Sequence, residues 1–256
     1  MVAAVGSWLD ARSNNGRWYL RIDDLDPPRV AAGSVESILG TLQAFGLNWD
    51  GEVLYQSERF DAYEQAVLLL KARGLTFPCA CTRKDLAGAE VYPGTCRHVL
   101  GVEPRSLRFR MESEAVVWHD QGLGEMQGNA ASDVGDFVLK NAHGIYSYHL
   151  ANAVDDIHLG ITHVVRGSDL APFTPAHMHV QRMLGGEDIS YHHLPLALDA
   201  DGHKLSKQTQ AEPVDVNQAV EVLKAVFTHL GLPPMEGNNA RELLARATRQ
   251  GAAIRP

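Results

Sequence analysis

The sequence predicts an α/β fold, in which strands of a parallel sheet alternate with helices. Short alternating or apolar runs are followed by loops and then by helix-length segments, which is the order of an α/β domain. Several of the helix-length segments are followed by glycine, the residue that most often ends a helix. The chain of 256 residues, with 45% hydrophobic and 21% charged residues, is long and apolar enough to bury a substantial core.

The first part of the chain has the pattern of a helix, a strand and two further helices. Residues 3–12 have the composition of a helix and stop at an Asn/Gly turn. Residues 17–22 alternate polar and apolar side chains as a strand does, and they lead into an acidic loop at residues 23–28. Residues 34–45 and 58–73 have helical apolar spacing, and each is followed by a glycine.

The middle of the chain has a different texture, and we interpret it as an insertion into the α/β domain. From residue 78 to about residue 140, cysteines are followed by short strand-like runs at 107–110 and 115–118, separated by Gly and Asp. The α/β pattern resumes at residues 146–150. A strand at 162–166, a helix at 174–184 and a strand at 192–198 follow, and helical segments at 214–230 and 240–248 end the chain.

These patterns predict four parts of the chain. Residues 1–77 and 141–210 form the two halves of one catalytic α/β domain, residues 78–140 form the inserted subdomain, and residues 211–256 form a short helical region. No apolar run approaches the ~20 residues that cross a bilayer, and the N-terminal segment lacks the features of a signal peptide. We therefore expect a cytoplasmic monomer without membrane association.

The net charge of −8 argues against general affinity for nucleic acid, because phosphate binding requires clustered cations. A local basic strip remains an alternative, although charges of this kind more often belong to a solvated face. The candidate cations for such a strip are Arg105, Arg108, Arg241, Arg246, Arg249 and Arg255.

Three thiols and a phenol lie close together in the sequence, at Cys79, Cys81, Tyr92 and Cys96. Zinc favours thiolates, and the Pro-Gly turn after Tyr92 returns the chain toward the first pair, so one tetrahedral ion could be held by all four residues. A disulfide between Cys79 and Cys81 would be strained. The alternative is a group of buried free thiols. We expect one structural Zn²⁺ per chain, because four protein ligands leave no open position for water.

Two further groups of residues have the chemistry of a ligand site. A tyrosine hydroxyl at Tyr148, the amide of Asn152 one helical turn later and the guanidinium of Arg166 suit an amino acid with its carboxylates and ammonium. Lys204 and Lys207 stand three residues apart in a Gly/Asp-rich loop, where two ammonium groups suit a polyphosphate. Taken singly, these residues are also common as a core aromatic, a helix cap and surface cations.

In their order along the chain, these motifs resemble the catalytic part of the class I glutamyl-tRNA synthetases. The resemblance covers nearly the whole chain, and the cysteine set and short length are most similar to the glutamyl-Q branch of that family, which lacks the anticodon-binding domains. It is carried by residues 21–26, the Cys79/Cys81/Tyr92/Cys96 set, residues 148–156, residues 166–169 and residues 204–207.

The resemblance implies a class I synthetase fold with a Rossmann-like parallel sheet, and an enzyme that activates L-glutamate with ATP and Mg²⁺ and transfers it to queuosine in tRNA(Asp). By similarity, Asp23, Tyr148, Asn152 and Arg166 bind glutamate. Lys204, Ser206 and Lys207 bind ATP, with the two lysines acting in catalysis. Asp23 stands where many relatives carry glutamate, so its contact to the substrate ammonium is expected to be longer or to pass through water.

Members of this family open with a strand and a His-x-Gly-His-like motif that contacts ATP, whereas residues 1–12 resemble the helix that follows that motif. We therefore expect the chain as written to lack the first strand of the sheet and to have little or no activity. Two alternatives to the ligase were weighed. One is a catalytically impaired paralogue that binds tRNA or zinc, and the other is a truncated glutamyl-tRNA synthetase that charges the 3′ end of tRNA.

Overall fold

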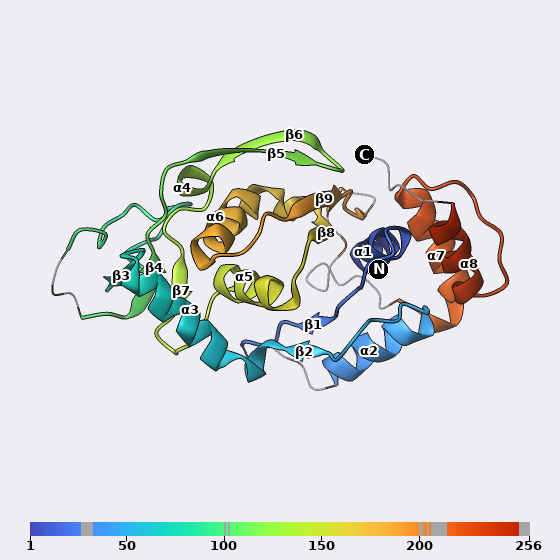
Figure 1. Cartoon of the computed structure of the whole chain (residues 1–256), viewed down its shortest axis with the longest axis horizontal. Coiled ribbons are helices and arrows are strands. Elements are labelled where there is room, and N and C mark those ends of the chain that lie inside the picture. Colours follow the sequence, from blue (N-terminus) through green and yellow to red (C-terminus); the bar gives the residue numbers. More distant parts are fainter. Residues whose placement is uncertain are drawn as a thin grey trace.

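The computed structural model describes residues 1–26, 33–99, 101, 103–199, 202–203, 205 and 214–250. Its strands form a four-stranded sheet, a three-stranded sheet and one separate pair (Figure 1). The strands are β1 (Arg21–Ile22), β2 (Leu54–Tyr55), β3 (Thr76–Cys79), β4 (Ser106–Phe109), β5 (Ala115–Asp120), β6 (Gly124–Asn129), β7 (Val138–Lys140), β8 (His163–Gly167) and β9 (Ser190–Leu194).

The four-stranded sheet has the order β6-β5-β9-β8. Strand β9 runs parallel to both β5 and β8, and β5 and β6 form an antiparallel hairpin that reaches along the upper edge of Figure 1. The three-stranded sheet β3-β4-β7 is antiparallel, and the pair β1-β2 is parallel. The predicted α/β class is therefore confirmed. Strands β5 and β6, which lie in the predicted insertion, share a sheet with β8 and β9. The boundaries of the four predicted parts of the chain stay a prediction.

The helices of the described chain agree closely with the sequence pattern. They are α1 (Val2–Ser13), α2 (Ser34–Ala44), α3 (Phe60–Ala72), the one-turn α4 (Ala130–Asp133), α5 (Tyr148–Leu159), α6 (Thr174–Leu184), α7 (Ala219–His229) and α8 (Ala240–Arg249). Short 3₁₀ turns lie at Gln56–Glu58, Ser168–Phe173 and Val216–Gln218. None of these helices combines the length and apolarity that a membrane crossing requires.

Two predicted strands are shorter than the sequence pattern suggests. Of residues 17–22 only Arg21–Ile22 pair as a strand, because Trp18 instead exchanges hydrogen bonds with the backbone and side chain of Asp50. The strand expected at 192–198 ends at Leu194, and the next residue is Pro195, which has no N–H to donate to a ladder.

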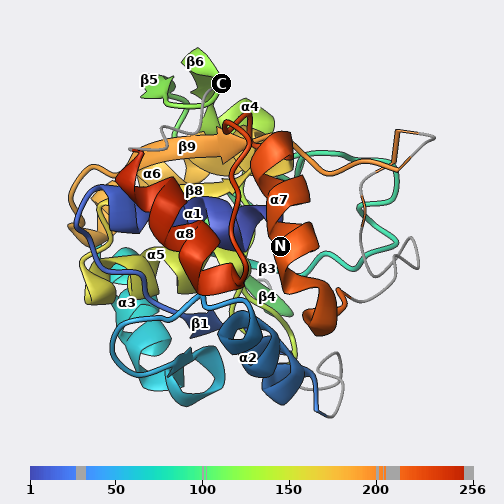
Figure 2. The same cartoon turned by 90° about the vertical axis from the view of Figure 1, so that its right-hand side faces the viewer.

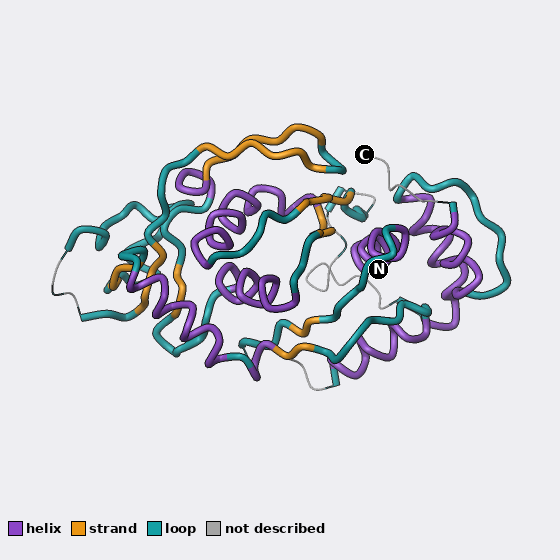
Figure 3. Tube along the Cα trace, viewed as in Figure 1, coloured by secondary structure: helices purple, strands orange, loops and turns teal. Residues whose placement is uncertain are grey.

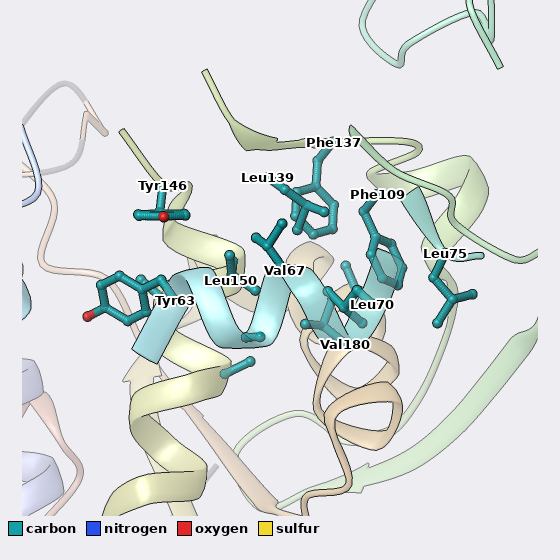
Figure 4. Packing of buried hydrophobic residues seen from close by; sticks show 14 of the residues in the cluster. Tyr63, Val67, Leu70, Leu75, Phe109, Phe137, Leu139, Tyr146, Leu150 and Val180 are labelled. Atoms are coloured by element: carbon teal, nitrogen blue, oxygen red, sulfur yellow. The ribbon is translucent and has the colours of Figure 1, made fainter. Parts of the chain in front are cut away.

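Two apolar clusters hold the helices in place. In the first, α3 and α5 pack with α6 against the inner side of β4 and β7, and Figure 4 shows Val67, Leu150 and Val180 meeting there. In the second, α7 and α8 cover α1, as Figure 2 shows from the side, with Leu9, Phe227 and Leu243 at the contact. The positions of α5 and α6 are therefore fixed by close packing, and so are the positions of the side chains on their remaining faces.

Candidate functional site

Helix α5 carries two of the predicted glutamate ligands. It begins after Ser147, whose hydroxyl accepts the backbone N–H of Leu150, and it ends at Gly160, which has a positive φ of 62°. These limits place Tyr148 in the first turn and Asn152 one turn further along the helix. The Tyr148 side chain is exposed, whereas Asn152 is buried.

Arg166, the third predicted ligand, lies at the end of β8 with a buried guanidinium. Its Nε donates to His193 Nε2 at 3.1 Å, and its Nη1 lies 2.8 Å from His177 Nδ1. Its Nη2 donates to Leu170 O at 3.1 Å and to Thr174 Oγ1 at 2.8 Å. These bonds account for four of the five N–H groups of a guanidinium and leave one on Nη1 for a ligand.

His177 connects Arg166 with Tyr148. The His177 ring stands 5.3 Å from the Tyr148 ring between centroids, and its Nε2 lies 3.0 Å from His149 Nδ1. Arg166 only donates, so His177 accepts at Nδ1 and carries its proton on Nε2, which faces His149. The structure thus brings Tyr148 and Arg166 onto the same histidine.

A second histidine holds the other side of Arg166. His193 accepts from Arg166 at Nε2, so its proton is on Nδ1, where it bonds to the buried carboxylate of Asp120. Oδ1 of Asp120 also accepts the backbone N–H groups of Gly122, Leu123 and His193. Burial alone would raise the pKa of Asp120, but the hydrogen bonds from His193 and Gly122 hold it below its ordinary value.

The histidines in this network are neutral at pH 7. Burial lowers the pKa of His149 to about 4, and the Arg166 charge acts in the same direction. Burial, followed by Arg166, lowers the pKa of His177 well below its ordinary value. Burial also lowers the pKa of His193, although Asp120 opposes the shift. Arg166 is therefore the cation of a buried group whose histidines are neutral, and this suits an anionic ligand such as a carboxylate.

Asn152 is held in a separate network between α5 and α3. Gln56 Nε2 donates to Asn152 Oδ1 at 3.2 Å and to Asp155 Oδ2 at 2.9 Å. The fully buried Asp155 also takes hydrogen bonds from Arg59 Nε at 2.6 Å and from the Tyr63 hydroxyl at 3.0 Å. This charged and hydrogen-bonded group fixes the rotation of α5 and so the positions of its ligand side chains.

The fourth predicted ligand, Asp23, approaches α5 through Arg21. Arg21 Nε lies 2.9 Å from Asp23 Oδ1, and Arg21 Nη1 lies 2.8 Å from Asp156 Oδ1 on α5. The three residues line one end of a cavity of about 810 Å³ between α1, β1 and β8. Tyr148, Asn152 and Arg166 are not among the described residues that line this cavity. The predicted ATP-binding residues Lys204, Ser206 and Lys207 lie outside the described residues.

The predicted metal ligands come together at the end of β3. Residues 80–99 and 103–105, drawn as loop in Figure 3, contain several turns and return Cys96 and Tyr92 to Cys79. The three cysteine sulfurs lie within 4.8 Å of one another, and Cys81 Sγ and Cys96 Sγ are 3.6 Å apart. Tyr92 Oη lies 3.5 Å from Cys79 Sγ and 3.7 Å from Cys81 Sγ.

These distances fit a tetrahedral zinc site. Zn–S bonds of about 2.3 Å and Zn–O bonds of about 2.0 Å imply S···S separations of about 3.8 Å and S···O separations of about 3.5 Å. Burial raises the pKa of the Cys79 thiol, but its interactions with Tyr92 and the Arg108 guanidinium outweigh burial and lower the pKa to about 7. Three close cysteines could thus bind a metal, and the donor set suits zinc.

Residues 2–91 and 99–248 match the sequence profile of the family described as tRNA synthetases class I (E and Q), catalytic domain. The chain belongs to this family. The class I resemblance and the class I fold predicted from the sequence are therefore confirmed, and the protein is a ligase enzyme of the aminoacyl-tRNA synthetase type.

Similar curated proteins place the chain in the glutamyl-Q branch of this family. The glutamyl-Q tRNA(Asp) synthetase of Neisseria gonorrhoeae is 45% identical over 95% of this chain and 87% of its own length. The proteins of the same name from Dechloromonas aromatica and Thiobacillus denitrificans are 45% and 44% identical over 90% and 97% of this chain, and 80% and 86% of their own lengths.

Two solved structures share the fold. A glutamate-tRNA synthetase from Elizabethkingia anophelis superimposes with a TM-score of 0.72 at 27% identity, over 81% of this chain and 49% of that one. A glutamate tRNA ligase from Elizabethkingia meningosepticum, in complex with its amino acid, gives 0.71 at 27% identity, over 81% and 48%. The chain spans about half the length of these two proteins.

Sequence reasoning did not identify Asp120, His177 and His193 as part of the site. They come from three separate elements, β5, α6 and β9, and each has other polar residues beside it, such as His119, His192 and His179, so none stands out in its own segment. The chain contains 12 histidines, so residue type alone does not single out these two. The one usable signal was that polar residues at expected core positions need partners.

Proposed function

We propose that the protein activates L-glutamate with ATP and transfers it to the queuosine base of tRNA(Asp). The names of its relatives support the substrate and the acceptor. The observation that carries the proposal is the buried Arg166, which retains one N–H on the nitrogen that bonds to His177, while the His177 ring contacts the Tyr148 ring. A buried cation with a free donor next to an exposed phenol is suited to a carboxylate.

In this proposal Arg166 and Tyr148 bind a carboxylate of glutamate, and the Asn152 amide lies one turn along α5 to complete the contact. Asp23 accepts the substrate ammonium directly or through water. Arg21 is then a positioning residue, because it joins Asp23 to Asp156 on α5. Burial raises the pKa of Asp156, and the Arg21 charge opposes the shift.

Activation follows by attack of a glutamate α-carboxylate oxygen on the α-phosphorus of ATP. The bond to the bridging oxygen breaks, pyrophosphate leaves, and glutamyl adenylate remains. In the second step a nucleophile of queuosine attacks the adenylate carbonyl, and AMP leaves. Lys204 and Lys207, with Ser206, neutralise the charge that develops on the phosphates. Mg²⁺ bound together with ATP would supply further neutralisation of the phosphate charge.

We further propose that Cys79, Cys81, Tyr92 and Cys96 hold one structural Zn²⁺. The support is their geometry, since the described sulfur and phenol separations match a four-coordinate site. Binding would fix residues 80–105, whose described parts contain no helix and no strand to hold them.

The deciding experiment uses protein produced from the complete gene and radiolabelled L-glutamate. Transfer is measured to tRNA(Asp) that carries queuosine and to the same tRNA that carries guanine at that position. We expect label only on the queuosine tRNA, and removal of the tRNA 3′ end should leave the transfer unchanged. Label that requires the 3′ end and ignores queuosine would instead identify an enzyme of the glutamyl-tRNA synthetase type. Binding of tRNA with no transfer of label would identify a non-catalytic paralogue.

A further inference from the structure

Arg108 on β4 is a buried arginine without a carboxylate partner. Its side chain is 7% exposed, so it does not belong to the basic surface strip considered from the sequence. Its Nη1 donates to the backbone oxygen of Asp136 at 2.7 Å, and its Nε has no hydrogen-bond partner. Among the described residues no ion pair includes Arg108. A buried guanidinium without a counter-charge is strongly destabilising, so a compensating charge is required.

The guanidinium of Arg108 faces the cysteine cluster. Arg108 pairs across the sheet with Phe77, so Cys79, two residues further along β3, projects from the same face. Its guanidinium carbon lies 3.8 Å from the centroid of the Tyr92 ring, and Tyr92 Oη in turn lies 3.5 Å from Cys79 Sγ. The arginine therefore packs on one of the four candidate ligands and lies on the same face of the sheet as a second.

A contact with the Tyr92 ring alone does not account for this burial. A desolvated cation–π contact stabilises less than the burial of an unpaired charge destabilises. Three thiolates on a divalent ion, by contrast, carry a net charge of at least −1. One guanidinium beside them balances that charge in a region where water cannot.

We propose that Arg108 is the buried counter-charge of the metal centre, a positioning residue that holds the Cys79 sulfur and the Tyr92 ring in place for Zn²⁺. This role rests on the zinc site proposed above. It assigns to residue 108 a function that neither the ligand pattern nor the sequence indicated, and it explains why β4 carries an arginine at a buried position.

The test compares Arg108→Met, Arg108→Lys and the control Arg110→Met in the full chain. Arg110 lies two residues from Arg108. It donates to the backbone oxygen of Arg97, and its guanidinium carbon lies 5.2 Å from the centroid of the Phe77 ring. The substitution Arg110→Met therefore removes the same charge from a side chain that contacts none of the four candidate ligands in these bonds. Zinc affinity is measured by competition with a chromophoric chelator. We expect Arg108→Met to bind zinc about 10–100-fold more weakly, Arg108→Lys to show a smaller loss and Arg110→Met to stay within about threefold of wild type.

Thermal unfolding with and without zinc separates this role from ordinary packing. A counter-charge predicts that Arg108→Met lowers Tm in the zinc-loaded protein and leaves it equal or higher in the zinc-free protein, where the unpaired cation is removed. Equal losses in both forms, or unchanged zinc affinity in Arg108→Met, would overturn the proposed role while leaving the zinc site intact. A wild-type protein that binds no zinc would overturn both.

Discussion

The orientation of Arg166 depends on which ring nitrogen of His193 carries the proton. The substitution Asp120→Asn should move that proton to the other nitrogen. Oδ1 of Asp120 accepts three backbone N–H groups, so an asparagine must keep its oxygen in that place. Its NH₂ group then faces His193 Nδ1, which must become an acceptor. The proton of His193 moves to Nε2, where it meets the Nε–H of Arg166.

This change leaves two donors facing each other in a buried site. An unsatisfied buried donor costs about 1–3 kcal/mol, and in a chain of this size each kcal/mol lowers Tm by about 2–4 °C. We therefore expect Asp120→Asn to lose about 2 kcal/mol of unfolding free energy and about 4–8 °C in Tm. Displacement of the Arg166 fork should also weaken glutamate binding by about tenfold.

Nitrogen-15 NMR of the histidine side chains reports the tautomer, and calorimetry reports Tm. Glu125→Gln is the matched control, because His119 Nδ1 lies 2.8 Å from Glu125 Oε1 while the two side chains are 68% and 74% exposed. That variant should change stability by less than about 0.5 kcal/mol. If His193 keeps its proton on Nδ1 in Asp120→Asn, or if Tm falls no further than in the control, the reasoning is wrong.

Three further predictions follow from other contacts. Tyr63→Phe removes a hydroxyl that donates to the fully buried Asp155 and should cost about 2 kcal/mol in urea unfolding. Tyr146→Phe removes a hydroxyl that donates to Glu64, whose side chain is 41% exposed, and should cost less than about 1 kcal/mol because water can replace the lost hydrogen bond; equal losses would contradict this. The pKa of His149 falls from 6.5 to about 4 on folding, so the free energy of unfolding should drop by about 3 kcal/mol as the pH falls from 6.5 to 4, and this group should have no effect above that range. His149→Gln should reduce the dependence of the unfolding free energy on pH in this range. An unchanged dependence would refute the assignment. Cys81→Ser should reduce the zinc content well below one per chain by elemental analysis, and full retention of zinc would argue against the four-ligand site.

Elements with strong local signals were predictable from the sequence. The helix at 174–184 has its observed limits because a proline starts it and Gly185, with a φ of 86°, ends it. The cysteine cluster was predictable because its residues are close in the sequence and share one chemistry. The strand at 17–22 was overestimated because an alternating pattern does not reveal that Asp50 takes the hydrogen bonds of Trp18.

The long-range part of the site was not predictable in this way. Asp120, His193 and Arg166 are joined by the parallel alignment of β5, β9 and β8, and no local pattern specifies which strands become neighbours. The sequence predicts Arg108 to be a surface cation because arginine is rarely buried, and only the pairing of β3 with β4 places it on the same face as Cys79. Such residues can be identified once the order of the strands is known and a partner is sought for each buried charge.

The proposed glutamate site is tested most directly by glutamate-dependent exchange of pyrophosphate into ATP, measured without tRNA on protein produced from the complete gene, as wild type and as Tyr148→Phe. We expect exchange with L-glutamate and not with L-glutamine, and a KM for glutamate about 10–100-fold higher in Tyr148→Phe, as loss of a hydrogen bond to a charged group implies. Tyr146→Phe should retain the wild-type KM. Exchange that does not depend on glutamate, or a KM unchanged by Tyr148→Phe, would show that this group of residues does not bind the amino acid.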